Sequence, residues 1–537
     1  MTIGSTPAHA QGTHSVRFDF WNNPLVVTAM RLKYRRGSPG VWAALWVLAL
    51  LGVGALLHHI SQTETFRFPS TYLVVILGLQ CIVSAVIAVI STSSSMNAEV
   101  VNRTLDFQRI VTLSPRAILL GKMIGEPALS YFLMIASMPL AALCWGFGAA
   151  SGSVIFWLYV NLLTFTLMWA AMGLINSLTP PTQAAGRTKS GGGGAGVVIM
   201  FAVVPQMLIH GRNSLDTPGV GDVVKLLTPI GSMAHLWKDN AWNASVSFWG
   251  VSLPSLLLAP IVQLSIAAWI VAAMSRRLKN QLDPLASKRC SYYTLAVIDL
   301  AISGICYAQW LQGYDAAKLV YGYGLAHIVV CLIMTFATVP RRPAILAWIW
   351  RRESPTPRLG ELLFADRSEM SLAAIVYGLI GLAVLAIGLV GPMALTATPA
   401  RAMVPPRDLV EIGVATFVIV VALTLLQQLL VASTSRGGSL MFILFVILAN
   451  LLPPICAAAL RASTTPVSES LTESIAALSP VALFVSNMQR VGSPNAGAAV
   501  LIIAYAVLAV FSFALLRRVL RREGATVRGK LQAMAVI

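Results

Sequence analysis

The chain has 537 residues, of which 57% are hydrophobic and 11% are charged, and its formal net charge is +18. Soluble domains carry about 25% charged residues, so this composition excludes an ordinary soluble protein. Apolar runs of about 20 residues, long enough to cross a bilayer as helices, recur from 41 to 518 and predict an all-α polytopic membrane protein.

Twelve membrane spans are predicted in chain order. The first six lie near 41–58, 71–94, 125–148, 154–176, 197–210 and 250–275, and the second six near 292–311, 318–338, 370–395, 409–432, 440–460 and 497–518. With a cytoplasmic N-terminus, most of the 38 Lys and Arg residues fall in cytoplasmic segments, whereas the 20 Asp and Glu residues divide evenly. This bias follows the positive-inside rule. It predicts that both termini are cytoplasmic, and it explains the net charge without a nucleic-acid partner.

The sequence also predicts two related halves. Residues 226–237 read LLTPIGSMAHLW and residues 477–488 read ALSPVALFVSNM, and each stretch precedes the last span of its set of six. We therefore expect a disordered tail over 1–20, a first six-span half over 21–280, and a second six-span half over 281–537 that ends in a basic cytoplasmic tail.

The stretch 21–37, WNNPLVVTAMRLKYRRG, predicts the first helix. Asn23 is suited to the N-cap and Pro24 to the first helical position. The basic residues gather toward the C-terminal end of this helix, at Arg31, Lys33, Arg35 and Arg36. Such a helix is expected to lie in the membrane interface with its basic groups at the lipid headgroups, and the alternative is a helix in a soluble tail.

A charged segment separates the second and third spans, and residues 102–122 read NRTLDFQRIVTLSPRAILLGK. Residues 99–111 fit a short amphipathic helix, because one face is shared by Val101, Thr104, Leu105 and Gln108. Ser114 is predicted to cap a second helix that begins at Pro115. Gly121 allows close approach, and Lys122 suits the membrane interface. Held between two spans, the segment can pass the movement of a cytoplasmic partner to the membrane, and the alternative is a solvated loop.

The order of these elements resembles the membrane subunits of ABC-2 type (type V) ABC transporters. The family has an acidic residue, a Thr-Leu pair, a Leu-Ser/Thr-Pro turn and a Gly-Lys pair ahead of its third span. The matching residues here are Glu99, Thr104, Leu105, Leu113, Ser114, Pro115, Gly121 and Lys122, while Arg103 stands where many members have Gly. The stretch NPLVVTAMRLKYRR resembles the family's opening elbow helix. The resemblance covers about 20–280 and is much weaker over 281–537.

The resemblance implies that 99–122 is a coupling segment that docks on a separate ATPase subunit. The residues implied in this coupling are Glu99, Arg103, Thr104, Leu105, Asp106, Phe107, Arg109, Ser114, Pro115, Gly121 and Lys122. The chain would then be a non-catalytic permease without a cofactor of its own, because ATP and Mg²⁺ bind to the partner. Two ATPase copies are implied, and the pathway is formed by one chain or with a second permease chain. The family also implies an exporter of a bacterial inner membrane and leaves the substrate open.

The loop 339–369 is the counterpart of this segment in the second half by position. It is basic and contains Trp348 and Trp350, but it lacks the Thr-Leu, Ser-Pro and Gly-Lys pattern. We treat it as a candidate second docking loop.

Few polar residues lie inside the predicted spans. Asp299 is the only acid well inside one, and intramembrane acids are often functional. It is expected either to bind a cation or substrate or to pair with Lys318 or His327. Asn450, followed by two prolines at 453–454, either breaks the eleventh span or marks a packed kink. His58 and His59 lack a third ligand and the six cysteines lack ligand spacing, so no metal site is predicted.

Two other functions compete with the permease reading. An ATP-independent secondary transporter of twelve spans would use Asp299 for ion coupling. A polytopic membrane enzyme would need acids or histidines gathered at one membrane face, and the sequence offers no such group.

Overall fold

The computed structural model describes residues 24–35, 38–62, 67–102, 114–177, 226–229, 245–280, 283–351, 358–397, 404–434, 438–462, 469–489 and 496–535. Within these ranges, eleven helices are long and apolar enough to cross a membrane, and each overlaps one of the predicted spans. The predicted fifth span at 197–210 and the N-terminal tail at 1–20 lie outside the described residues. The chain is therefore a multi-pass α-helical membrane protein.

The first half is a bundle in which the second span packs along the fourth and the fourth along the last. These contacts join α3 to α7 and α7 to α12. The elements described here are α1 (Pro24–Arg35), α2 (Ser38–Ser61), α3 (Phe68–Val101), α5 (Pro115–Gly125), α6 (Ala128–Gly146), α7 (Gly152–Ser177) and α12 (Ser255–Lys279).

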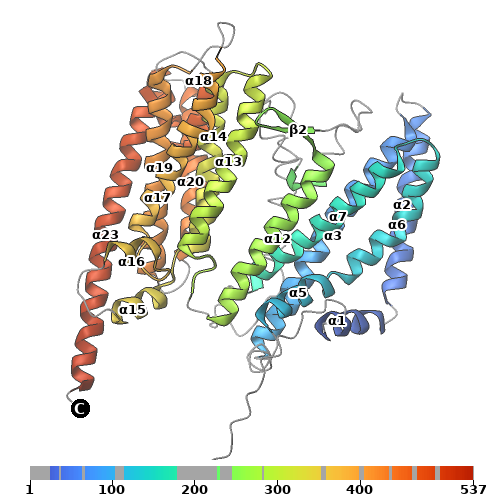
Figure 1. The fold of residues 1–537 in the computed structure, drawn as a ribbon, viewed down its shortest axis with the longest axis horizontal. Coiled ribbons are helices and arrows are strands. Elements are labelled where there is room, and N and C mark those ends of the chain that lie inside the picture. The colour runs from blue at the N-terminus through green and yellow to red at the C-terminus, as the bar shows by residue number, and fades with distance from the viewer. Residues whose placement is uncertain are drawn as a thin grey trace, which may run out of the picture.

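The second half repeats this pairing, because α14 packs on α19 and α19 packs along α23. Its elements are α13 (Lys288–Leu311), α14 (Ala316–Thr338), α15 (Arg342–Arg351), α16 (Leu359–Phe364), α17 (Ser371–Ala383), the π-helix η1 (Val384–Val390), α18 (Gly391–Leu395), α19 (Pro406–Ser433), α20 (Gly438–Ala462), α21 (Glu469–Ala476), α22 (Pro480–Gln489) and α23 (Ala496–Ala535). The two halves stand side by side, with α12 and α13 between them (Figure 1).

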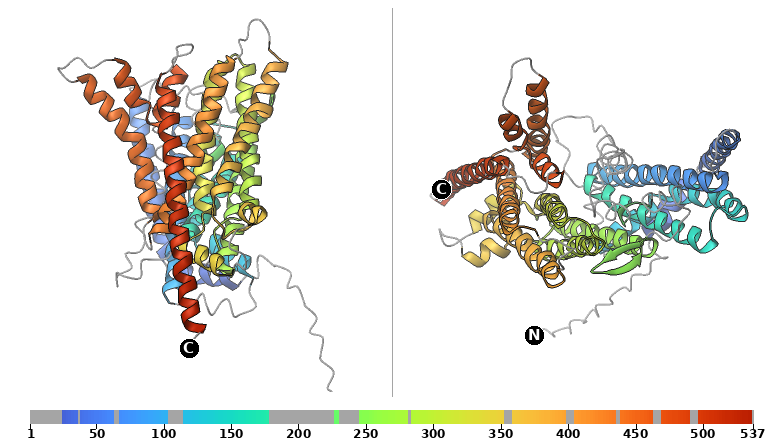
Figure 2. Two further views of the ribbon diagram at one scale, coloured as in Figure 1. Left: turned by 90° about the vertical axis from the view of Figure 1, so that its left-hand side faces the viewer. Right: turned by 90° about the horizontal axis from the view of Figure 1, so that it is seen from above.

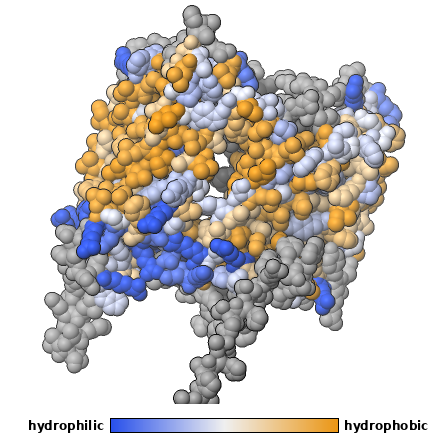
Figure 3. All heavy atoms as spheres, in the orientation of Figure 1, coloured by the Kyte–Doolittle hydropathy of each residue, from blue (hydrophilic) through white to orange (hydrophobic). Residues whose placement is uncertain are grey.

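The short helices α1, α5, α15 and α16 and the C-terminal end of α23 lie at one end of the bundle, which we call the base (Figure 1). Hydrophobic side chains cover most of the visible surface above it, and strongly hydrophilic ones gather at the base (Figure 3). The apolar surface suits lipid tails, and the polar base suits headgroups and water. Seen from above, α20 lies at the periphery of the second half, where it packs against α21 and α19 (Figure 2).

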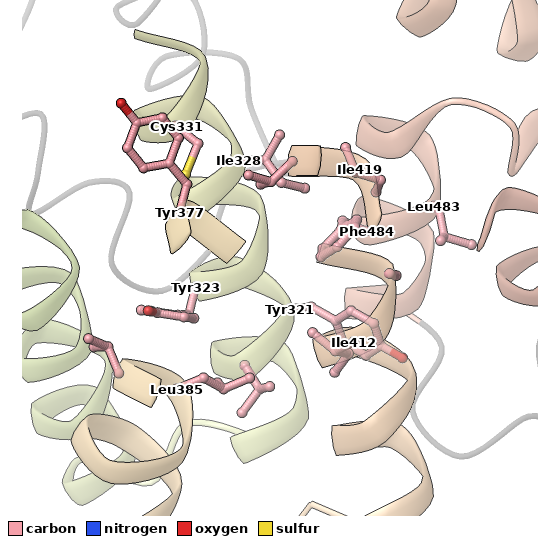
Figure 4. Packing of buried hydrophobic residues seen from close by; sticks show 14 of the residues in the cluster. Tyr321, Tyr323, Ile328, Cys331, Tyr377, Leu385, Ile412, Ile419, Leu483 and Phe484 are labelled. Atoms are coloured by element: carbon pink, nitrogen blue, oxygen red, sulfur yellow. The ribbon is translucent and has the colours of Figure 1, made fainter. Parts of the chain in front are cut away.

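The core of the second half is built around aromatic side chains. Tyr321 of α14 meets Phe484 of α22 edge to face, with 6.0 Å between the ring centroids (Figure 4). Gly324 makes room for this contact, because a Cβ there would lie 2.7 Å from the Phe484 ring and 2.9 Å from Thr416 Oγ1. The short helix α22 is thereby packed against α14.

A β-hairpin precedes α12, so the sixth span begins at Ser255 and not at the predicted residue 250. Strands β1 (Ser245–Phe248) and β2 (Val251–Pro254) pair antiparallel around the turn residues Trp249 and Gly250, both at positive φ. The Trp249 backbone N–H donates to Gly304 O at 3.1 Å, and a Cβ on Gly304 would lie 2.5 Å from the indole Nε1. The hairpin of the first half is thus seated on α13 of the second.

Of the two alternatives for the eleventh span, the break is excluded, because α20 runs unbroken through Pro453 and Pro454. Asn450 is instead a packing residue: its Nδ2 donates to Val446 O, and its Oδ1 accepts from the Val481 N–H at 3.3 Å. The irregular span is the ninth, where the seven-residue π-helix η1 interrupts the α-helix. Nothing in the sequence analysis anticipated it.

Candidate functional site

The centre of the predicted coupling segment lies outside the described residues. This applies to Arg103, Thr104, Leu105, Asp106, Phe107 and Arg109. The residues on either side are described, and they correct one expectation. Glu99 is not the start of a separate helix, because α3 continues without interruption to Val101. The second span therefore extends well beyond the predicted residue 94.

A buried polar cluster joins the two sides of this segment. Lys122 Nζ of α5 lies 2.6 Å from Glu99 Oε1 of α3, and it also donates to Ser95 Oγ at 2.9 Å. Ser95 Oγ in turn donates to Glu126 Oε1 at 2.6 Å. Lys122 is only 4% exposed, so the ion pair is held in an environment that strengthens it. We call Ser95, Glu99, Lys122 and Glu126 the Lys122 cluster.

The helix after the segment begins as predicted. Ser114 Oγ accepts a hydrogen bond from the Ala117 backbone N–H at 3.2 Å, and Pro115 occupies the first helical position. This helix, α5, does not run into the third span, because it ends at Gly125 and α6 begins at Ala128. It packs against α1, α7 and α12, and Gly121 is buried among these contacts. α5 is thus a separate short helix in contact with several spans.

A helix is present where the sequence predicted the first one: α1 begins at Pro24. Asn23 and Arg36 lie outside the described residues. The helix extends through Arg35, with Arg31 exposed and Val26 buried. Because α1 packs mainly on α5, the two helices form one layer across the base of the first half (Figure 1).

In the second half, the intramembrane acid is paired. Asp299 Oδ2 of α13 lies 2.8 Å from His327 Nδ1 of α14, and both side chains are fully buried. The predicted alternative partner, Lys318, lies nine residues before His327 on α14, about 13 Å along a helix. The second carboxylate oxygen, Asp299 Oδ1, has no hydrogen-bond partner. Such an oxygen is an acceptor that a proton or cation can satisfy.

Three neighbours that sequence reasoning missed surround this pair. The Tyr323 ring stacks on the His327 ring, and Cys331 Sγ lies 3.3 Å from His327 Nε2. A Cβ on Gly381 of α17 would lie 2.3 Å from His327 Nε2, so only glycine fits there. The π-helix η1 begins three residues later, at Val384. π-Helical turns occur frequently at functional sites.

The candidate second docking loop contains two helices, α15 and α16, at the base. Ala344 and Ile345 of α15 are buried, whereas Trp350 is 60% exposed. Arg342 Nη2 pairs with Glu523 Oε1 of α23 at 2.7 Å, which fixes α15 to the last span. Within this loop, α15 therefore packs against the last helix.

The start of α13 is anchored by a buried lysine in this region. Lys288 Nζ donates to Leu362 O, Ser368 Oγ and Glu369 O at 2.7–2.8 Å, so all three of its protons have acceptors. Its backbone N–H donates to Asp366, which also pairs with Arg276 of α12. This network joins the two halves at the base.

The first half has a buried amide cluster near the hairpin. Gln263 of α12 accepts from Thr164 Oγ1 at 2.6 Å and donates to Asn161 Oδ1 at 2.8 Å, both on α7. Gln263 Nε2 also lies 3.5 Å from Leu226 O, beside the buried Thr228 of the repeated stretch. These neutral groups mainly satisfy one another, which is typical of polar contacts between membrane helices.

An apolar cavity of about 150 Å³ lies between α14, α19, α20, α22 and α23. Its lining is aliphatic apart from Asn450, Pro480 and Tyr505. In the described part of the chain, no group of three His, Cys, Asp or Glu side chains is placed to hold a metal ion. Comparisons with protein-family models, curated proteins and solved structures found no match to this chain.

Proposed function

We propose that this chain is the membrane-spanning permease subunit of an ATP-driven ABC-2 type transporter, acting as an exporter in a bacterial inner membrane. Both termini are cytoplasmic in this proposal, and two copies of a separate ATPase subunit bind at the base. The partner supplies ATP and Mg²⁺, and the chain supplies the pathway.

The observation that carries the proposal is the ion pair between Lys122 and Glu99. These residues lie on either side of the segment 103–113, whose sequence resembles a coupling helix. Because the pair joins α5 to α3, a force on the segment acts on both helices together. α5 passes this force to α1, α7 and α12, which it contacts. A force applied at the one docking segment is therefore transmitted to most helices of the first half.

The test is purification of the tagged full chain in mild detergent, with mass spectrometry of co-purifying proteins. An ATPase with a Walker A motif is expected with the wild type. The variant Phe107→Ala/Arg109→Glu changes the segment itself and should lose this partner. A folded, abundant wild-type protein that brings down no such ATPase would contradict the proposal.

A second variant separates docking from force transmission. Lys122→Met removes the ion pair without changing the segment, so the ATPase should still bind while ATP-driven transport falls. Lys279→Met is the matched control, because Lys279 is exposed near the end of α12 and is outside the Lys122 cluster. Equal loss in both variants would show that the Lys122 cluster has no special part in coupling.

An ATP-independent secondary transporter is the second candidate, and the Asp299–His327 pair favours it. A fully buried carboxylate with one unpartnered oxygen, beside a π-helix, is suited to binding and releasing a proton. Liposomes containing the purified chain alone, loaded with a pH-sensitive dye, test this function. Proton movement that needs no ATPase and is lost in Asp299→Asn would favour this candidate over the permease.

A further inference from the structure

Two arginines at the base, one from each half, lack acidic partners among the residues that the structure describes. Arg277 lies in the last turn of α12 and is only 6% exposed. Arg341 lies between α14 and α15 and is half-buried. The two cations are close enough for their charges to repel one another. Neither forms an ion pair or hydrogen bond through its side chain within the described part of the chain, and Arg277 Nη2 is buried without an acceptor.

Four acids that the structure describes in this region are already engaged with other bases. Asp366 pairs with Arg276, and Asp283 accepts two hydrogen bonds from Arg367 at 2.7–2.8 Å. Glu369 pairs with Arg517, and Glu523 with Arg342. Neither Arg277 nor Arg341 takes part in any of these four ion pairs. An unpaired buried charge costs several kcal/mol, so a fold that retains the buried Arg277 in this state, within the electrostatic influence of a second cation, is expected to offset that cost with a ligand.

We propose that Arg277 and Arg341 form a binding site for an anion of the phosphate class, carried by a phospholipid headgroup or free in solution. A guanidinium stays charged at neutral pH and binds phosphate oxygens through two parallel N–H groups. Burial lowers the pKa of Arg341 from its ordinary value, which reflects the same loss of water that strengthens its attraction for an anion.

The position of the site suits such a ligand. Arg277 lies two residues before the end of α12, and Arg341 lies three residues past the end of α14. Both residues are thus at the ends of their spans, next to the loops of the base. Arg341 also immediately precedes α15, whose N-terminal end carries a partial positive charge. A bound phosphate would join α12 of the first half to the loop after α14 of the second.

The test compares the full chain in neutral detergent with Arg277→Gln and Arg341→Gln. Thermal unfolding is followed with phosphatidylglycerol, with phosphatidylcholine, and with inorganic phosphate. Arg518→Gln is the matched control, because Arg518 is exposed on α23 and its loss changes the net charge equally. The wild type and the control should be stabilised by phosphatidylglycerol or by phosphate and not by phosphatidylcholine. Each site variant should bind the anion about tenfold to hundredfold more weakly.

The stability without an anion distinguishes a ligand site from a structural role. Arg277→Gln should then unfold at the same temperature as the wild type or higher, because an unpaired buried charge has been removed. A variant that is destabilised equally with and without the anion, and still responds fully to it, would overturn the proposal. So would an equal loss of response in Arg518→Gln. If Arg277→Gln does not fold, the half-buried Arg341→Gln decides between these results.

The source of the anion is read from the same data. A response to phosphatidylglycerol alone assigns the site to a lipid headgroup, and a response to inorganic phosphate alone assigns it to a soluble anion. Native mass spectrometry of the wild type and Arg277→Gln then counts the phospholipids retained. The absence of any anion response in the folded wild type would refute the site.

Discussion

Lys122 of α5 and Glu99 of α3 form an ion pair with 2.6 Å between Nζ and Oε1, on either side of a segment that connects their helices. The pair is largely buried, with side-chain exposures of 5% and 19%. A short loop between two spans does not require such a pair. The ion pair holds the C-terminal end of α3 close to α5, independently of what the connecting segment contacts.

Removing the lysine should therefore weaken the fold as well as coupling. Lys122→Met leaves Glu99 without this cation, and we expect a loss of about 2–4 kcal/mol in the free energy of unfolding. Lys279→Met should change it by less than about 0.5 kcal/mol. Chemical unfolding in detergent measures both. Equal stability of the two variants would mean that the buried pair contributes nothing to the fold.

The N-cap of α5 should make a smaller and separable contribution. Ser114→Ala removes the acceptor for the Ala117 N–H and should cost about 1 kcal/mol, whereas Ser114→Asp keeps an acceptor and should retain most of the stability. The comparison of the two unfolding midpoints is the measurement. A Ser114→Asp protein as unstable as Ser114→Ala would show that the cap is unimportant.

Asp299 and His327 should be strongly coupled. Asp299→Ala alone should cost about 3 kcal/mol, because it leaves a buried imidazole without its partner. His327→Leu alone is expected to cost a similar amount, and the double variant less than the sum of the two. A double-mutant cycle of unfolding free energies gives the interaction directly. Additive effects would mean that the 2.8 Å contact carries no energy.

Gly381 should tolerate no side chain. Gly381→Ala places a Cβ 2.3–2.6 Å from the His327 ring, which must then move away from its position beside α17. We expect a loss of about 1–3 kcal/mol. Gly78→Ala in α3 is the control, because its Cβ meets nothing within 4 Å and should stabilise the helix slightly. If both variants unfold at the same temperature, the His327 ring can move aside for a Cβ at position 381 without a loss of stability.

Hydropathy located the eleven described spans because the thickness of the hydrocarbon core sets a minimum length of apolar sequence for each of them. Local chemistry also predicted the start of α1 at Pro24 and the cap of α5 at Ser114. It failed where the contact partner is distant in sequence. Lys122 and Glu99 were both named from the family pattern, but their pairing depends on how α3 and α5 pack.

The irregular features were missed for similar reasons. Two adjacent prolines left open a break in α20 or a packed kink, and the helix continues, because proline in a membrane helix can be accommodated by neighbouring groups. The π-helix η1 has no proline within it, and its packing against α13 joins segments that are distant in sequence. Arg277 looks like an ordinary basic residue at the end of a span, and only its burial distinguishes it from Arg276.

The hairpin 245–254 limits how the two halves can move. Trp249 contacts Gly304 at the upper end of α13, Trp269 Nε1 donates to Thr294 Oγ1 at 3.1 Å lower down, and Arg276 pairs with Asp366 at the base. Three attachments in a line resist sliding and separation along that line. From these contacts we infer that rotation of each half about an axis parallel to α12 and α13 is the relative motion they oppose least.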